Sequence, residues 1–230
     1  PPQYCFVSLK SSVSLAHKTK VFEELYDVSR ETIEKLLIYE KLILNAQEKY
    51  NLVGKSTLSQ VWLRHFADSA KIFQIIEDRY NKSKKDPISF ADIGSGAGFP
   101  GVVISLMLEA KHMIVRTILI DSNKKKSIFL ENVKKKMELS YIVLNKRSES
   151  VEEKFDIITA RAVTSIKKFL DINYNLFKKD SIIILLKGKT WREEIKESKK
   201  KWKFQFNVVK NNNQLDSSGG VTLIIRNVKK

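Results

Sequence analysis

The stretch SFADIGSGAGFPG, Ser89–Gly101, holds four of the chain's eight glycines within eight residues. A short apolar run, Ile88–Ile93, leads into these glycines, and a second apolar run, Val102–Leu108, follows them. Glycine adopts positive φ without strain and lets another group come close to the backbone. We therefore expect a strand, a tight turn and a helix, with the turn either reversing the chain only or also approaching a ligand.

The glycine stretch begins a region in which short apolar runs alternate with helix-length segments. The expected strands are 88–93, 115–121, 140–145, 155–160 and 181–188. The expected helices are 101–110, 123–138, 164–177 and 191–200. This alternation predicts βαβ units and a doubly wound, mostly parallel sheet of the Rossmann-like α/β class. Segments 201–210 and 221–230, around a polar turn at 211–220, predict an antiparallel hairpin at one sheet edge.

The chain before the glycine stretch predicts a helical appendage. Residues 29–50 carry apolar side chains at helical spacing and predict an amphipathic helix, and a second helix is expected over 58–76. The side chains expected along one side of the second helix are Val61, His65, Ser69 and Ile72. The polar segment Asn81–Pro87 is the expected linker. We therefore divide the chain into a tail with a helical appendage, 1–86, and a ligand-binding domain, 87–230.

Composition favours a soluble cytoplasmic protein that binds a polyanion. Apolar residues make up 43% of the chain, its mean hydropathy is −0.26, and no apolar run approaches the roughly 20 residues of a membrane span. A net charge of +16 and a pI near 9.7 favour nucleic acid over an anionic membrane, although a lysine-rich composition typical of an AT-rich genome is an alternative. The single cysteine, Cys5, allows neither an internal disulfide nor a thiolate metal cluster, and the three histidines lack metal-ligand spacing. We expect no metal.

Two nucleotide-binding patterns overlap in the glycine stretch. Gly96, Gly98 and Gly101 match the dinucleotide fingerprint G-x-G-x-x-G, but Pro100 interrupts it. Counted from the strand end, the pattern begins instead with Asp92 two residues before the first glycine, the form found in adenosylmethionine-dependent methyltransferases. In both dinucleotide-binding enzymes and methyltransferases, an acidic residue at the end of the second strand accepts hydrogen bonds from the ribose hydroxyls. Asp121 occupies that place, with a helix N-cap as its alternative role.

Residues that the chain lacks limit which acceptor atoms it could methylate, if it is a methyltransferase. With Cys5 as the only thiol, a cysteine adduct at C5 of a pyrimidine is not expected, and no Asn-Pro-Pro-Tyr-like motif indicates an exocyclic amine as acceptor. The remaining acceptors are atoms with a ready lone pair, such as guanine N7. Such an atom needs no general base, so catalysis consists of alignment and desolvation.

Seven motifs between about Ile38 and Gly188 occur together in a recognisable order. They are NLVG, WLRHFADS, DIGSGAGFPG, LIDSNKKKSIFL, RSES, FDIITARAV and LLKGK. In this order they resemble the small-subunit ribosomal RNA methyltransferase G family, also called glucose-inhibited division protein B. The family more often has Ala-Glu where this chain has Ser148–Glu149, a change between small residues that should leave a backbone contact intact.

The resemblance implies a cofactor, S-adenosyl-L-methionine, and the residues that bind it. Gly94 and Phe99 would line the cofactor, Asp121 would take its ribose, and Ser148–Glu149 would bracket its adenine. Arg161, in the TARA motif, would lie by the site as a further cofactor-binding residue and the candidate catalytic residue. Segment 87–230 would then be the methyltransferase domain.

The implied activity is methyl transfer to N7 of one guanosine in small-subunit (16S) ribosomal RNA, by a cytoplasmic monomer acting on the RNA or on the assembled 30S particle. Two other classes stay open: a non-catalytic RNA-binding module and a nicotinamide-dependent oxidoreductase that uses the literal glycine fingerprint.

Several of these residues also have structural interpretations. The alternative for Glu149 is an ordinary exposed loop acid. Arg161 could instead pair with Asp156 or Glu149, or meet an RNA phosphate or the target base. Arg64–His65 is either an RNA contact or a half-buried helix pair. The lysines of helix 123–137 form either an RNA-binding track or a solvated face. The apolar residues expected to face the sheet from that helix are Ile128, Phe129, Val133 and Met137.

Overall fold

A computed structural model of the chain describes residues 15–83, 87–210 and 220–230. Its centre is a seven-stranded sheet with strand order β3-β2-β1-β4-β5-β7-β6. The strands are β1 Ile88–Ile93, β2 Val115–Ile120, β3 Ile142–Leu144, β4 Phe155–Arg161, β5 Phe177–Lys187, β6 Lys203–Lys210 and β7 Val221–Lys229. The first five strands pair in parallel, whereas β7 is antiparallel to both β5 and β6. The predicted doubly wound sheet with an antiparallel edge hairpin is confirmed.

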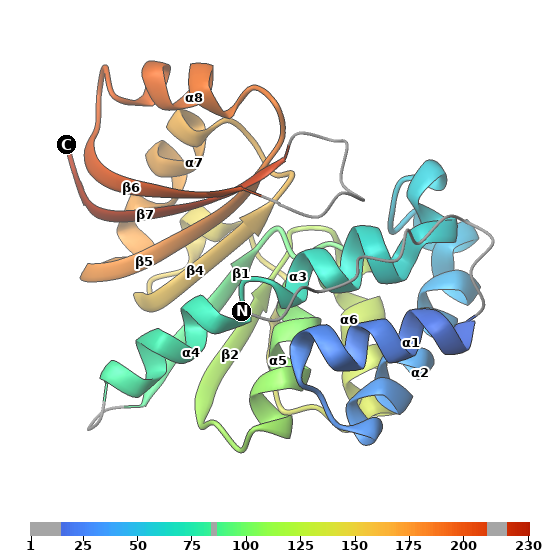
Figure 1. The fold of residues 1–230 in the computed structure, drawn as a ribbon. Helices are drawn as coiled ribbons and strands as arrows, with labels where there is room; N and C mark the ends of the chain where they lie inside the picture. The colour runs from blue at the N-terminus through green and yellow to red at the C-terminus, as the bar shows by residue number, and fades with distance from the viewer. Residues whose placement is uncertain (1–14, 84–86, 211–219) are drawn as a thin grey trace.

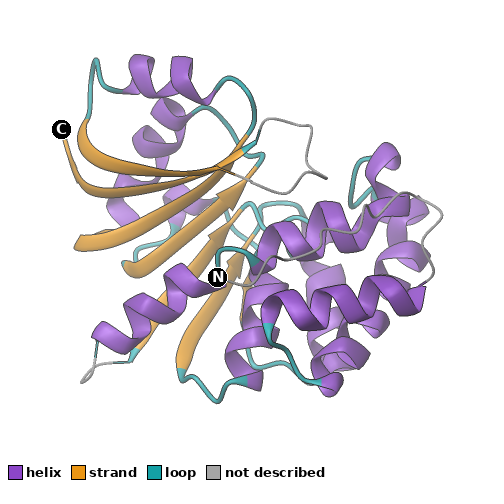
Figure 2. Cartoon of the chain, viewed as in Figure 1, coloured by secondary structure: helices purple, strands orange, loops and turns teal. Residues whose placement is uncertain are grey.

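Helices cover both faces of this sheet (Figures 1 and 2). The α-helices are α1 Leu15–Tyr26, α2 Arg30–Tyr50, α3 Asp68–Ala70, α4 Phe73–Lys82, α5 Gly101–Ala110, α6 Lys124–Met137, α7 Ile166–Asn173 and α8 Trp191–Ser198. Short 3-10 helices are η1 Lys55–Gln60, η3 Ser148–Ser150 and η4 Tyr174–Leu176, and η2 Trp62–Ala67 is a π-helix. One core cluster joins α1–α6 to one face of the sheet, and a second joins α7 and α8 to the other.

The position of each strand in the sheet decides its sequence pattern. β1 lies in the interior of the sheet, between β2 and β4, with helices on both faces, and all six of its residues are buried. β6 lies at one edge, where its residues alternate between exposed and half-buried. β3, at the other edge, has only three residues instead of the six expected over 140–145. Central strands are therefore easier to predict from apolar runs than edge strands.

The predicted helix over 58–76 is wrong in form, although its buried side is right. The segment forms η1, then the π-helix η2, then α3 and the start of α4. Val61, His65, Ser69 and Ile72 are all buried as expected, and so are Trp62 and Phe66. The wider π turn lets adjacent residues of this segment face inward together, which a regular α-helical stripe does not accommodate. By contrast, the helix expected over 29–50 is confirmed as α2, capped by the Ser29 side chain.

Two smaller expectations need correction. Ile128 is 51% exposed on α6, whereas the other three side chains expected to face the sheet are buried, together with Leu130. Neighbouring helix positions lie about 100° apart, so the buried stripe centred between Phe129 and Val133 turns Ile128 outward. The helix expected over 164–177 ends at Asn173 and is followed by η4. Part of the expected linker, 84–86, and the hairpin turn 211–219 lie outside the described residues, as does Cys5.

Candidate functional site

The glycine stretch forms a loop between β1 and α5 at the carboxyl edge of the parallel strands. Gly94, Gly96 and Gly98 have φ values of +67°, +62° and +101°. A Cβ at Gly98 would overlap the Val102 side chain and lie 2.5 Å from the Tyr39 hydroxyl oxygen. At Gly96, in contrast, the nearest atoms to such a Cβ lie 3.8 Å and 4.0 Å away. The loop therefore packs tightly at Gly98 and leaves the backbone of Gly96 approachable.

Asp92, at the end of β1, joins the two ends of this loop through hydrogen bonds. Its Oδ2 accepts hydrogen bonds from the Ser95 hydroxyl at 2.6 Å and from the Gly101 amide at 3.1 Å. Its Oδ1 accepts from the Thr159 hydroxyl at 2.9 Å. The side chain is completely buried, and this burial raises the pKa of Asp92 to about 6 despite those hydrogen bonds.

The raised pKa of Asp92 predicts a pH dependence of stability. In the unfolded chain the carboxyl has an ordinary pKa of 3.8, so between about pH 4 and pH 6 the folded protein binds more protons than the unfolded chain. The contribution of Asp92 to the free energy of unfolding therefore decreases by about 3 kcal/mol as pH rises through this window. In Asp92→Asn this decrease is absent.

Urea unfolding of both proteins at pH 4.5 and pH 7 measures the effect, because other titrating groups cancel in the comparison. We expect Asp92→Asn to gain stability relative to the wild-type protein at the higher pH. A difference between the two proteins that does not change with pH would contradict the assignment.

Asp121 lies at the end of β2, directly beside the open part of the loop. One carboxylate oxygen accepts from the Gly96 amide at 2.8 Å, and the other accepts from the Asn123 amide at 2.8 Å. The alternative role of Asp121 as the N-cap of α6 is wrong, because the Asn123 side chain caps that helix. Each Asp121 oxygen accepts one bond and keeps further acceptor capacity, which suits a group that carries neighbouring hydroxyls.

Ser148 and Glu149 lie in η3, between β3 and β4. Ser148 is half-buried and Glu149 is exposed, with its carboxylate 4.0 Å from the Arg147 guanidinium. Asn145, which precedes η3, donates to the backbone oxygen of Asp121 at 2.9 Å. This bond holds the segment before η3 at the carboxyl edge of the sheet, beside the glycine loop.

Arg161 ends β4 and inserts its guanidinium between the glycine loop and the π-helix η2. Its Nη1 donates to the Arg64 backbone oxygen at 3.0 Å, and its Nη2 contacts His65 Nδ1 at 2.5 Å. Asp68 Oδ2 lies 4.0 Å from Nη1. The guanidinium carbon lies 5.1 Å from the centre of the Phe99 ring, which is itself buried and faces η2.

The alternative ion pairs considered for Arg161 do not occur. Asp156 lies near the start of β4, at the opposite end of the strands, where it bonds to Ser89 and Lys178. Glu149 pairs with Arg147 instead. The acid that Arg161 does approach, Asp68, lies in the helical segment before the sheet.

His65 is a buried part of the site and not a surface contact. Burial, with the nearby Arg161 and Arg64 charges, lowers its pKa to about 3, so the ring is neutral at physiological pH. Its ring stacks on Phe99 with centres 4.8 Å apart. The structural interpretation of His65 is confirmed.

Sequence reasoning missed Tyr39 and Asp68. The Tyr39 hydroxyl donates to the Ala97 backbone oxygen at 2.5 Å and so supports the loop from α2. The signal for Tyr39 was a bulky polar-tipped residue on the buried side of an otherwise aliphatic helix. The sequence held no signal for Asp68, because its carboxylate approaches Arg161 only in the folded protein.

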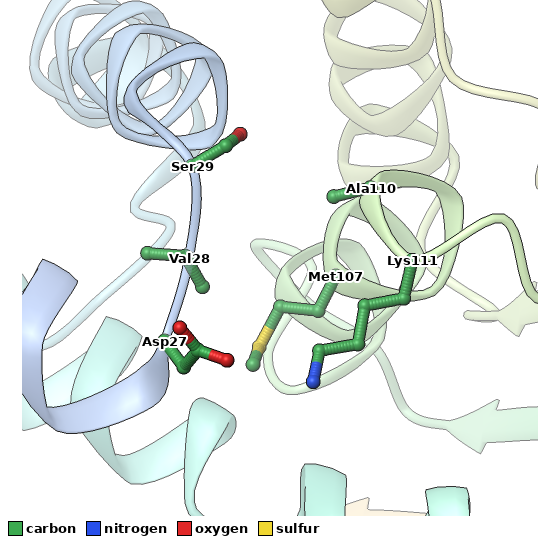
Figure 3. Close-up of a pocket in the computed structure, with 6 residues that line it drawn as sticks. All are labelled: Asp27, Val28, Ser29, Met107, Ala110 and Lys111. Carbon is green, nitrogen blue, oxygen red and sulfur yellow. The ribbon is translucent and has the colours of Figure 1, made fainter.

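A separate pocket of about 320 Å³ lies between the α1–α2 connection and the C-terminal end of α5 (Figure 3). Asp27, Val28 and Ser29 line one side of it, and Met107, Ala110 and Lys111 line the other. The glycine loop precedes α5 at its other end, so this pocket is not part of the site. The described residues contain no cluster of ligands that could hold a metal ion. In the same ranges no helix is long and apolar enough to span a bilayer.

The structure is similar to solved methyltransferases in fold. A tRNA (m1A58) methyltransferase from Aquifex aeolicus matches with a TM-score of 0.55 and 14% identity, over 71% of this chain and 69% of that chain. An S-adenosylmethionine-dependent methyltransferase from Clostridium acetobutylicum matches with a TM-score of 0.51 and 11% identity, over 68% of this chain and 90% of that chain. At these identities the similarity establishes the shared Rossmann-like methyltransferase fold.

Sequence comparison is more specific. The family model for rRNA small subunit methyltransferase G (GidB) matches residues 32–220. A protein of that name from Rickettsia felis is 36% identical over 79% of this chain and 88% of its own length. Another from Bartonella tribocorum is 32% identical over 91% of this chain and 94% of its own length. The matched region contains both the glycine loop and Arg161, and the chain therefore belongs to the rRNA small subunit methyltransferase G family.

Proposed function

We propose that this chain transfers the methyl group of S-adenosyl-L-methionine to N7 of one guanosine in small-subunit (16S) ribosomal RNA. Family membership supports the proposal, together with a single geometric observation: the open backbone of Gly96 lies within hydrogen-bond distance of the Asp121 carboxylate. An open glycine backbone and an acid on the neighbouring strand are what a nucleoside cofactor requires at this edge of the sheet.

The residues at this edge fit S-adenosyl-L-methionine. Asp121 would accept from its ribose hydroxyls, and Ser148–Glu149, on the same edge, would contact its adenine. Gly94 and Gly96 would offer backbone, while Phe99 and Arg161 would form the wall toward η2. When bound, the cofactor supplies an electrophilic methyl group on a positively charged sulfur.

Guanine N7 suits this set of residues because it carries a lone pair and no proton. Asp92 is buried and already accepts three hydrogen bonds beneath the loop, so it is not placed to take a proton from a substrate. His65 is buried, neutral and bonded on both nitrogens. The chain's contribution is therefore to orient the acceptor and exclude water, with no general base required.

Ribosomal RNA also fits the charge of the chain. The net charge of +16 attracts a polyanion, and Lys124 and Lys125 are exposed in the first turn of α6, next to Asp121. We propose a cytoplasmic monomer without a metal, acting on the assembled 30S particle or on the RNA alone. We also propose that 1–86 is an appendage to the methyltransferase domain 87–230, with which it shares one core cluster.

The test is to incubate the protein and labelled S-adenosyl-L-methionine with small subunits from cells that lack the enzyme, and in parallel with naked 16S RNA. We expect label in one guanosine, released as N7-methylguanine, and much less label with Asp121→Ala at a cofactor concentration near the wild-type Kd. Label at a pyrimidine carbon would contradict the proposed chemistry. Salt-dependent RNA binding without transfer to either substrate would support a non-catalytic module instead, and enhanced fluorescence of a reduced nicotinamide dinucleotide would support an oxidoreductase.

A further inference from the structure

A continuous series of hydrogen bonds links the turn before η1 to the guanidinium of Arg161. The Thr57 hydroxyl lies 2.8 Å from the Gly54 backbone oxygen and 2.9 Å from His65 Nε2. On the other side of the ring, His65 Nδ1 meets Arg161 Nη2. Gly54 is exposed and Thr57 is half-buried, so the series runs from the protein surface to the half-buried guanidinium of Arg161.

Only one arrangement of hydrogens satisfies all of these bonds. A guanidinium has donors and no acceptor, so His65 Nδ1 must accept from Arg161. The proton of the neutral ring then lies on Nε2 and is donated to Thr57 Oγ1. The Thr57 hydroxyl hydrogen is thereby left for the Gly54 oxygen. Each bond dictates the direction of the next, and the ring is held as a single tautomer.

Packing leaves the His65 ring little freedom to choose another partner. The ring is 6% exposed and lies nearly parallel to Phe99, at an interplanar angle of 18°. Arg161 lies over the same Phe99 ring and is anchored a second time by the Arg64 backbone oxygen. Both hydrogen-bond acceptors of Arg161 lie in the π-helix η2, and the Asp68 carboxylate adds an ion pair at 4.0 Å. The π-helix is a rare element that is frequently found at functional sites.

We propose that His65, oriented by Thr57, is a positioning residue that holds Arg161 against Phe99 in the orientation needed to bind S-adenosyl-L-methionine. The proposal rests on the proposed function and adds to it two residues outside the sheet. His65 does not touch the cofactor; it acts by accepting a hydrogen bond from Arg161. A loss of this acceptor should weaken cofactor affinity even where the fold is retained.

The role of His65 Nδ1 as an acceptor is tested with two matched pairs of variants, one at His65 and one at Thr57. In His65→Asn the side-chain oxygen replaces Nδ1, whereas His65→Leu keeps the bulk and loses the acceptor. Thr57→Ser keeps the hydroxyl, whereas Thr57→Val loses it at a half-buried position. Ser59→Ala, in the exposed part of the same 3-10 helix, is the control. The measurement is the Kd for S-adenosyl-L-methionine by calorimetry.

We expect a roughly 10-fold weaker Kd in His65→Leu and a roughly 3-fold weaker Kd in Thr57→Val, as for one lost hydrogen bond to a charged and one to a neutral group. His65→Asn should bind clearly more tightly than His65→Leu, and Thr57→Ser more tightly than Thr57→Val, both close to wild type. Ser59→Ala should be unchanged. Equal affinities in His65→Leu, Thr57→Val and the wild-type protein would overturn the positioning role. A wild-type protein that itself fails to bind the cofactor would instead refute the proposed function.

The tautomer gives a second test that needs no folded variant at His65. Two-bond proton–nitrogen NMR correlations of the wild-type protein at neutral pH should show His65 with a protonated Nε2 and an unprotonated Nδ1. Comparison with variants that lack His17 or His112, the other two histidines, assigns the signal. A protonated Nδ1 would overturn the proposal, whatever the affinities of the variants.

Discussion

Replacing Gly101 with alanine is expected to lower the free energy of unfolding by about 3 kcal/mol and to abolish tight binding of S-adenosyl-L-methionine. A Cβ at this position would overlap the Leu119 side chain and lie 2.7 Å from Asp92 Oδ2 and 2.9 Å from Asp92 Cβ. Leu119 and Asp92 are fully buried in the central strands and have no room to move aside, so the start of α5 must shift. Overpacking of this kind costs up to about 3 kcal/mol, and occasionally more.

The shift also explains the expected loss of binding. Moving the first residue of α5 lengthens the bond from the Gly101 amide to Asp92, and Asp92 is the group that joins the two ends of the glycine loop. Gly188→Ala is the matched control, because a Cβ at Gly188 would meet no atom within 4 Å. Urea unfolding and calorimetry measure the two effects. Unfolding midpoints that agree between Gly101→Ala and Gly188→Ala would show that the packing at Gly101 is not as tight as described.

Asp121→Ala is expected to weaken S-adenosyl-L-methionine binding about 100-fold while leaving the protein folded. The substitution removes the acceptor proposed for two ribose hydroxyls, and hydrogen bonds to a charged group contribute about 1.5–3 kcal/mol each. It also releases the Gly96 amide from its 2.8 Å bond, which loosens the loop at its open point. Asp121→Asn should be intermediate, since an amide keeps one acceptor oxygen and places an NH2 group against a backbone amide.

Asp180→Ala is the matched control for Asp121→Ala. Asp180 is an exposed acid near the start of β5, at the opposite edge of the sheet from the glycine loop. The Asp180→Ala substitution removes the same charge without changing the site. The Kd of this variant for S-adenosyl-L-methionine should therefore equal that of the wild-type protein. If Asp180→Ala and Asp121→Ala weakened binding equally, overall charge and not the Asp121 hydrogen bonds would account for the effect.

The parts of the fold that the sequence predicts well are those in which local and tertiary forces agree. β1 and α5 have the predicted bounds because a buried strand, a run of glycines and an apolar helix follow one another without ambiguity. α7 and β3 are shorter than predicted, because their ends depend on contacts that apolar runs do not report. The π-helix η2 was not predictable from a periodicity of 3.6, and of its buried residues only His65 was expected to face inward.

The residues of the site also divide into those that the sequence predicts and those that only the structure reveals. Asp92 and Asp121 were predictable because an acid at the end of a parallel strand must lie at the carboxyl edge of the sheet. The partners of Arg161 were not, since His65 and Asp68 precede it by more than ninety residues and reach it only through the packing of η2 on the loop. Sequence reasoning therefore located the loop and its acids, and the structure was needed to find what holds Arg161.

The exposed edge strand β6 has a consequence for how copies of this chain behave at high concentration. In the described part of the chain β6 pairs only with β7, and an edge strand of this kind invites a neighbouring chain to extend the sheet. The strand begins and ends with lysine, and the exposed positions between carry Gln205 and Asn207 as well as Val209. Repulsion between the lysines of two approaching edges opposes such edge-to-edge pairing.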